Sequence, residues 1–136
     1  MRLFIYGTLL DGLAHGEAAR LVAGLPPGES ASVAGGLRLV EEPLGCYPVL
    51  VPGVEGRVIG QVIDCPDDPT WLAELDAYEG PDYGRWMVTA QLKDGTEVEA
   101  AAYICLIVDT GGLEPVPHGD FARFIAESGR SVFGAN

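Results

Sequence analysis

Basic side chains are scarce in this 136-residue sequence, which has eight Lys and Arg against 20 Asp and Glu and a formal net charge of -12. A surface of this sign repels phosphate backbones and acidic lipid headgroups. We therefore expect neither nucleic acid nor a membrane as a partner. Histidine is equally sparse, and His15 and His118 lie too far apart in the sequence to indicate a metal site.

Cysteine pairs and long hydrophobic runs are also missing. Cys46, Cys65 and Cys105 are odd in number and form no CxxC motif, which fits a reducing compartment better than a disulfide framework. The longest apolar stretch, residues 100–108, is too short to span a bilayer, and the short run over residues 3–6 is not a signal peptide. We expect a soluble cytoplasmic protein.

Apolar residues, glycine and proline are abundant. The hydrophobic fraction is 48%, and 19 glycines and ten prolines are distributed along the chain. This composition indicates a folded globule with many turns and short strands. The length fits a single domain over residues 1–136.

Hydrophobic periodicity and turn residues predict more strands than helices. The Asp94-Gly95 dipeptide between two strand-like runs is a strong hairpin signal. The pattern indicates an α+β domain with a small, curved or barrel-like sheet. We expect strands at 3–6, 32–41, 54–65, 85–93 and 96–108, an extended edge segment at 47–52, and helices at 13–22, 69–79 and 120–128.

The helix expected over residues 69–79 has an Asp-Pro start signal and a Gly-Pro stop. Leu72, Leu75 and Glu79 are spaced i, i+3 and i+7, so they share one face. Burial and the negative end of the helix dipole both raise the pKa of a carboxyl group at this position. Glu79 is therefore a candidate general acid/base. The other interpretation is a frayed last-turn residue that points into solvent.

A glycine follows the first buried strand, in the segment Tyr6-Gly7-Thr8-Leu9. Such a bend exposes successive backbone N–H groups that can bind a carboxylate or an oxyanion, and the Thr8 hydroxyl adds a donor. An ordinary strand-ending turn remains the other interpretation.

Several further polar residues have open roles. Asp76 can raise the pKa of Glu79, or it can bond the local backbone or Arg85, and we favour this structural role. Arg85 could bind a substrate carboxylate, but an internal acidic partner is the preferred interpretation. Tyr83 and Tyr103 are candidates for substrate binding through their hydroxyls, or for core packing. No local signature supports a nucleophilic Cys–His pair.

The order of these motifs resembles the gamma-glutamylcyclotransferase-like superfamily, specifically its short branch of AIG2-like and gamma-glutamylamine cyclotransferase proteins. The likeness spans nearly the whole chain. The sequence departs from the family pattern at Phe121, where tryptophan is common, and at Leu10-Asp11-Gly12. The matching segments are Phe4-Ile5-Tyr6-Gly7-Thr8-Leu9, Tyr47-Pro48-Val49-Leu50, residues 54–62, Leu75-Asp76-Ala77-Tyr78-Glu79-Gly80, Tyr83-x-Arg85, Ala102-Tyr103-Ile104 and His118-Gly119-Asp120-Phe121.

The resemblance implies a small mixed β-barrel with flanking short helices and no cofactor. It implies that Tyr6, Gly7, Thr8 and Leu9 line the substrate pocket and that Glu79 is the catalytic acid/base. The implied partner is a small-molecule γ-glutamyl substrate. In the family reaction the α-amine attacks the γ-amide carbonyl, releasing 5-oxoproline and a free amine, so proximity is largely built into the substrate.

Other functions remain open at this point. The chain could be a noncatalytic binding module that keeps the pocket for an anionic small molecule. It could also be a biosynthetic enzyme that removes a γ-glutamyl protecting group by the same mechanism. The leaving amine depends on the variable loops over residues 10–16 and 108–117, and neither that amine nor the oligomeric state can be predicted from the sequence.

The helix geometry makes a prediction about Glu79. Its carboxyl group should titrate well above the unperturbed value of ~4.3, because both burial and the helix dipole disfavour the charged form. NMR titration of the Glu79 side chain measures this directly. A pKa at or below the unperturbed value would contradict the prediction.

Overall fold

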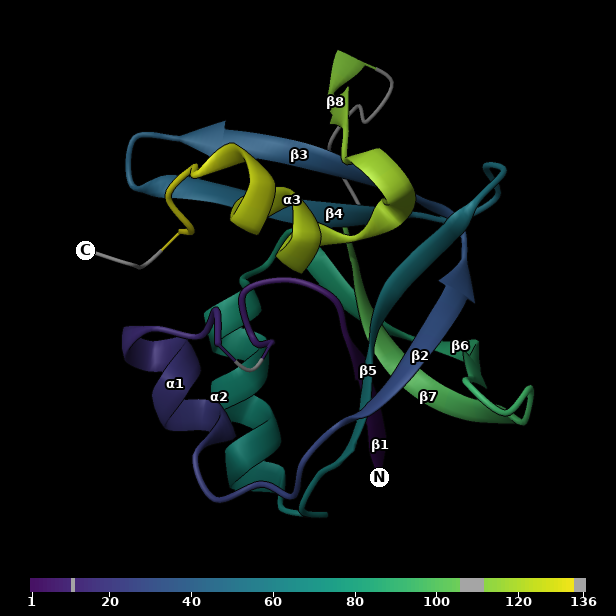
Figure 1. The fold of residues 1–136 in the computed structure, drawn as a ribbon. Helices are drawn as coiled ribbons and strands as arrows, with labels where there is room; N and C mark the ends of the chain where they lie inside the picture. The colour runs from purple at the N-terminus through teal and green to yellow at the C-terminus, as the bar shows by residue number, and fades with distance from the viewer. Residues whose placement is uncertain (11, 106–111, 134–136) are drawn as a thin grey trace.

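The strands form a closed barrel and a smaller sheet in the computed structural model, which describes residues 1–10, 12–105 and 112–133 (Figure 1). The barrel closes through a parallel pair between its first and last strands, at Leu3 and Ala101, whereas its other pairs are antiparallel. The predicted α+β fold with a small mixed barrel is confirmed. The barrel order is β1 (Arg2–Ile5), β5 (Arg57–Asp64), β2 (Glu29–Ala34), β6 (Tyr83–Leu92) and β7 (Glu97–Cys105).

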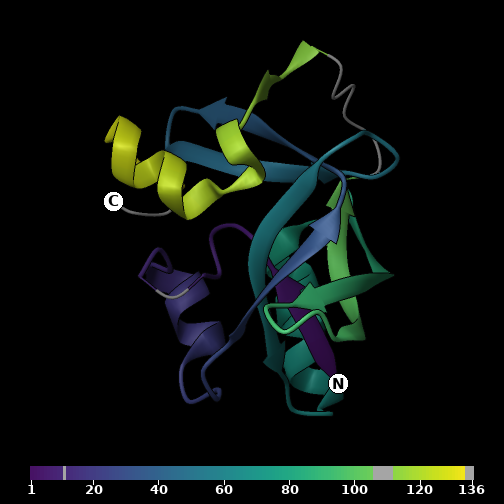
Figure 2. The same cartoon turned by 45° about the vertical axis from the view of Figure 1, so that its right-hand side comes forward.

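The second sheet has three strands in the order β4 (Gly45–Val51), β3 (Gly36–Glu42) and β8 (Glu114–Pro115), and helix α3 (Phe121–Ser128) lies over one face of it (Figure 2). Strand β4 is at the edge of this sheet, so the predicted edge position of residues 47–52 is confirmed. The Asp120 side chain accepts a hydrogen bond from the Arg123 N–H at 3.1 Å and caps α3, as predicted. The 3-10 turn η2 (Pro117–Gly119) precedes α3.

Helix α2 (Pro69–Glu79) has the predicted bounds. The Asp68 carboxylate accepts a hydrogen bond from the Thr70 N–H at 2.9 Å, which satisfies one free donor of the first turn. At the other end, Gly80 has a φ of 92° and its N–H donates to the Asp76 carbonyl at 2.9 Å. The two ends fix where the last helical side chain emerges.

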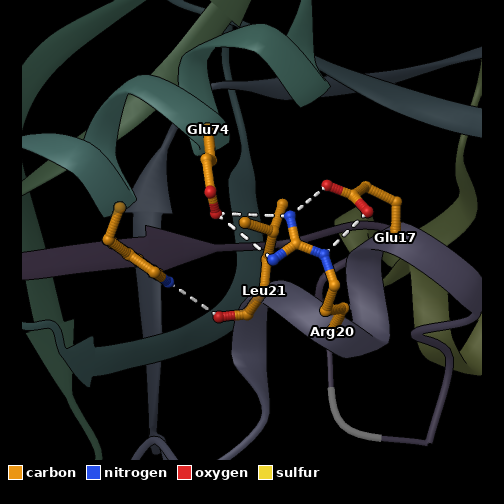
Figure 3. A network of polar contacts seen from close by, with 5 residues as sticks. Glu17, Arg20, Leu21 and Glu74 are labelled. Atoms are coloured by element: carbon orange, nitrogen blue, oxygen red, sulfur yellow. Dashed lines mark hydrogen bonds and ion pairs between the residues drawn. The ribbon is translucent and has the colours of Figure 1, made fainter.

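Helix α1 (Gly16–Val22) lies beside α2, outside the barrel (Figure 1). Arg20 donates to the Glu74 carboxylate at 3.2 Å, and the Trp71 indole N–H donates to the Leu21 carbonyl at 2.9 Å (Figure 3). The exposed ion pair adds little stability, but together with the indole bond it fixes the position of α2 relative to α1.

Buried apolar side chains anchor α2 on the barrel. Leu75 is fully buried and belongs to the same apolar cluster as Leu3, Ile5 and Leu21. This cluster places the face of α2 that carries Leu75 against β1. In the described ranges, no helix is long and apolar enough to cross a membrane.

The single strand predicted over residues 32–41 is wrong, because two strands of different sheets occupy this region. Gly35 separates them with a φ of 144°, and its N–H donates to the Gly56 carbonyl at 3.0 Å. Glycine adopts this backbone conformation at low cost, so the chain turns from the barrel into the second sheet here. The apolar residues on both sides concealed the break in the sequence pattern.

Two predicted elements are longer than the observed ones. The helix expected over 13–22 begins at Gly16, because the N–H groups of Leu13 and Ala14 both donate to the Leu10 carbonyl and form a separate turn. The strand expected from residue 54 begins at Arg57. The predicted hairpin is confirmed, although residues 106–108 of its second strand lie outside the described residues.

Gly60 provides a test of the barrel geometry. A Cβ atom at this position would collide with the Ile5 carbonyl oxygen, where β1 and β5 pair. We expect Gly60→Ala to lower the free energy of unfolding by about 1–3 kcal/mol, as overpacking does. Urea denaturation measures the change. Gly112→Ala is the matched control, because its added methyl group meets no atom within 4 Å, and it should leave the midpoint nearly unchanged. Equal midpoints for the two variants would contradict the close packing.

Candidate functional site

A cavity of about 270 Å³ opens where the C-terminal end of α2, the segment after β1 and the start of β4 meet. Every site residue predicted from the sequence lines it. The chain segments that carry these residues are far apart in the sequence, and the barrel brings them together. The residues are Tyr6, Gly7, Thr8, Leu9, Glu79, Tyr83 and Tyr103.

Glu79 is the last residue of α2, and its side chain faces this cavity rather than open solvent. No hydrogen-bond partner for its carboxylate occurs among the described residues. Removal of water raises the pKa of this carboxyl group to about 7, and the nearby charge of Asp76 contributes in the same direction. The group is therefore poised between its two protonation states at neutral pH, and the interpretation of a frayed, solvated residue is wrong.

Asp76 is held by two neighbours, one turn before Glu79 on the helix. Arg85 donates to its carboxylate through Nε at 2.8 Å and Nη2 at 3.2 Å, and the Tyr103 hydroxyl donates at 2.6 Å. The favoured Asp76–Arg85 pairing is thus confirmed. Because Arg85 is bound there and does not line the cavity, its guanidinium group is not placed to bind a substrate carboxylate.

Buried tyrosines form one wall of the cavity. The Tyr6 hydroxyl donates to the Tyr103 carbonyl at 2.6 Å, which joins β1 to β7 at the level of the cavity. Burial raises the pKa of Tyr6, Tyr83 and Tyr103, so their hydroxyls stay protonated at neutral pH. Tyr6 and Tyr103 combine packing with hydrogen bonds of their hydroxyls, whereas Tyr83 lines the cavity and keeps both of the roles considered for it.

The segment after β1 forms a tight turn, closed by a bond of 3.0 Å from the Leu10 N–H to the Gly7 carbonyl. Within the described part of the chain, the N–H groups of Thr8 and Leu9 meet no acceptor. The Thr8 hydroxyl lies 2.8 Å from that of Tyr78. Gly7 is required by packing, because an added Cβ would come within 2.8 Å of Pro48. The turn therefore lines the cavity and carries two backbone N–H groups without an acceptor among the described residues, which is the kind of donor that an anion-binding turn uses.

The sequence interpretation missed the outer part of the site. Tyr78 directly precedes Glu79 within the same motif but gave no separate signal. Tyr47 was noted within a motif without an assigned role. Glu42, Asp82 and Phe133 lie in turns or at strand ends, where a sequence pattern does not indicate a common cavity, and all of these residues line it.

No cysteine or histidine is found among the described residues that line the cavity. Cys46 and Cys65 are buried free thiols, and Cys105 is partly buried. In the ranges that the structure covers, no group of three or more His, Cys, Asp or Glu side chains could hold a metal ion. The chemistry available at the site comes from the Glu79 carboxyl group, the tyrosine hydroxyls and the backbone donors.

Solved structures with a similar fold include three proteins of low sequence identity. YkqA from Bacillus subtilis matches with a TM-score of 0.69 and 22% identity over 94% of this chain, which spans only 42% of YkqA. An uncharacterized protein from Pyrococcus horikoshii matches with a TM-score of 0.67 and 21% identity over 95% of this chain and 96% of its own. An AIG2-like protein from Mus musculus matches with a TM-score of 0.66 and 20% identity over 88% and 86%.

No curated protein sequence matches the chain. The family model described as gamma-glutamyl cyclotransferase, AIG2-like, matches residues 3–123 and so includes every predicted site residue. The chain belongs to the AIG2-like gamma-glutamyl cyclotransferase family.

Proposed function

We propose that this protein is a cyclotransferase that converts a γ-glutamyl amine or a related small amide into 5-oxoproline and the free amine. The nitrogen of the α-amine forms a bond to the γ-carbonyl carbon, and the bond from that carbon to the leaving nitrogen breaks. Both reacting groups belong to one substrate molecule, so the site has to hold a folded conformer and move protons from the attacking nitrogen to the departing one.

Glu79 moves these protons. Its carboxylate takes a proton from the α-ammonium group, which frees the nitrogen lone pair for attack, and the resulting carboxylic acid gives this proton to the departing nitrogen. The attacking nitrogen loses a second proton as it becomes the lactam N–H; the regenerated carboxylate takes this proton and passes it to the released amine, which leaves as an ammonium ion. A pKa of about 7 suits both steps, because the group accepts and releases a proton with similar ease at neutral pH.

The turn after β1 supplies the donors. The N–H groups of Thr8 and Leu9 bind substrate oxygens, either the α-carboxylate or the oxyanion that develops on the γ-carbonyl. The tyrosines close the cavity around the folded substrate. The proposal depends above all on one observation, which is that the Glu79 carboxyl group, with no hydrogen-bond partner among the described residues, lines a cavity that the turn after β1 also lines.

Replacement of the proposed proton carrier tests the mechanism. We expect Glu79→Gln to fold and to lose cyclotransferase activity by at least about 100-fold, because the amide keeps the shape but cannot transfer the proton. Release of 5-oxoproline from a panel of γ-glutamyl amines and dipeptides measures activity. Glu74→Gln, an exposed substitution on the same helix, is the control and should retain activity.

Two outcomes of that assay would contradict the mechanism. Normal turnover by the Glu79→Gln variant would remove Glu79 from the chemistry. No release of 5-oxoproline from any member of the panel by the unmodified protein would favour a noncatalytic binding module instead.

The acid side of the pH profile gives a separate test. Glu79 must be ionised to accept a proton, so kcat/KM should fall below about pH 7, roughly tenfold per pH unit. Asp76→Asn removes a neighbouring negative charge, which lowers the pKa of Glu79 and shifts this limb to lower pH. In Glu74→Gln the limb should stay in place. If the acid limb does not move in Asp76→Asn, the charge of Asp76 does not raise the pKa of Glu79 as stated.

A further inference from the structure

The last described residues of the chain run along the edge of β4 that does not pair with β3. The Cys46 N–H donates to the Ser131 carbonyl at 2.9 Å, and the Phe133 N–H donates to the Cys46 carbonyl at 2.9 Å. Val132, between these two bonds, forms a parallel bridge with Cys46 and is buried in the same apolar cluster. We call residues 131–133 the C-terminal strap, because they cross the start of β4 in a fixed register.

Arg130 fixes the position at which the strap begins. Its guanidinium group binds the carboxylates of Glu41 at 2.6 Å and Glu114 at 3.2 Å, and the carbon of that group lies 5.2 Å from the centre of the Phe124 ring. These three partners belong to β3, β8 and α3. A single exposed ion pair adds little stability, whereas several contacts on one guanidinium group restrict its position.

Gly45 allows the strap to approach β4 closely. A Cβ atom at this position would lie 2.6 Å from the backbone of Val132 and Phe133, and the φ of Gly45 is 125°. Both the available space and the backbone conformation therefore require glycine here. Gly45 itself is not among the described residues that line the cavity, so it acts on the cavity only through its neighbours.

The strap places the ring of Phe133 in the wall of the cavity. Phe133 and Tyr47 pack edge to face with ring centroids 5.7 Å apart, and both line the cavity. The next residue of β4, Pro48, also lines it and lies against Gly7, where an added Cβ would come within 2.8 Å. The aromatic pair therefore continues the wall that begins at the turn after β1.

This part of the wall lies outside the segment that the family model matches, which ends at residue 123. Glu79 and the turn after β1 lie inside that segment, so the family accounts for them and not for the strap. An aromatic ring in a cavity wall offers a ligand apolar contact area and displaces water, but it has no proton to exchange. The role of Phe133 therefore follows from its contacts in this structure.

From these contacts we infer that Phe133 is a substrate-binding residue, and that the C-terminal strap, with Gly45 as a positioning residue, holds its ring in the cavity. The inference rests on the proposed cyclotransferase function and extends the site to the C-terminal segment. Because the ring takes no part in proton transfer, it contributes equally to binding of the substrate and of the transition state. Loss of such a contact raises KM and leaves kcat nearly unchanged.

Removal of the ring tests this role, with γ-glutamyl-n-butylamine as the substrate. We expect Phe133→Ala to raise KM about three- to tenfold and to leave kcat within about twofold. Phe133→Tyr keeps the ring and should retain the original KM. Leu44→Ala is the matched control, because Leu44 is an exposed apolar residue next to Gly45 and lies outside the described cavity wall. An unchanged KM in Phe133→Ala, or a fall of kcat as large as the rise of KM, would overturn the inference.

A second set of variants tests the strap. In Gly45→Ala the added methyl group displaces the strap, so KM should rise as in Phe133→Ala. The double variant Gly45→Ala/Phe133→Ala should have a KM close to that of the weaker-binding single variant, because both changes remove the same contact. Effects on KM that multiply in the double variant would contradict a positioning role of Gly45.

Arg130→Gln tests the strap independently if Gly45→Ala does not fold. It removes the ion pairs next to the strap without placing an atom in the core, and KM should rise about twofold with kcat unchanged. Arg123→Gln, which breaks an exposed ion pair with Glu127 on α3, is the control and should leave KM unchanged. Equal KM values for the two arginine variants would refute the role of the strap.

Direct binding separates this inference from the proposed reaction. If the unmodified protein releases no 5-oxoproline from γ-glutamyl-n-butylamine, the proposed reaction fails for this amine. Calorimetric affinities of the same compound then decide the role of Phe133 alone. Weaker binding by Phe133→Ala than by Phe133→Tyr supports the inference, whereas equal affinities, or no binding to the unmodified protein, reject it.

Discussion

The packing of helix α2 on the barrel determines where the chemistry of this protein can take place. Leu75 is fully buried in the cluster that also contains Leu3 and Ile5, and the face that carries it also carries Glu79 at its end. Burial of that apolar face is favourable, and the last helical turn extends past the core into the cavity. The Glu79 carboxyl group therefore loses part of its hydration without gaining a partner from the described residues, and this raises its pKa.

Barrel closure brings the other half of the site to the same place. The parallel pair between β1 and β7 sets the segment after β1 beside the end of β7, where the Tyr6 hydroxyl binds the Tyr103 carbonyl. The side chain of Tyr103 in turn binds Asp76 on α2. One strand residue thus connects the donor turn to the helix that carries the carboxyl group, and the geometry of the cavity depends on this connection.

Carboxylates lie at both ends of the site, and their surroundings differ. At its inner end, the charge of Asp76 is held by Arg85 and Tyr103, yet still disfavours ionisation of Glu79. At its outer end, Glu42 and Asp82 remain exposed and carry no ion pair to a described residue. The described part of the cavity wall thus carries carboxylates and no basic side chain, and the backbone N–H groups of the turn after β1 are the kind of donor that suits an anion.

Much of the fold and the inner site could be predicted from the sequence, because the signals are local. The Asp-Pro start and Gly-Pro stop define α2, its apolar spacing places Glu79 on the core face, and the glycine after β1 indicates the donor turn. The order of these motifs also supports the family, which its model confirms over residues 3–123. The break at Gly35 was missed, because apolar residues continue on both sides of it.

The outer site depends on tertiary structure. Glu42, Asp82 and Phe133 come from the end of one strand, a turn and the C-terminal segment, and only the folded chain brings them to one opening. The sequence by itself determined the identity and helical position of the carboxyl group at the centre of the site, because helix spacing and end signals are local properties. Tertiary structure alone decided which charges surround the cavity, because that depends on which distant carboxylates pair with an arginine and which do not.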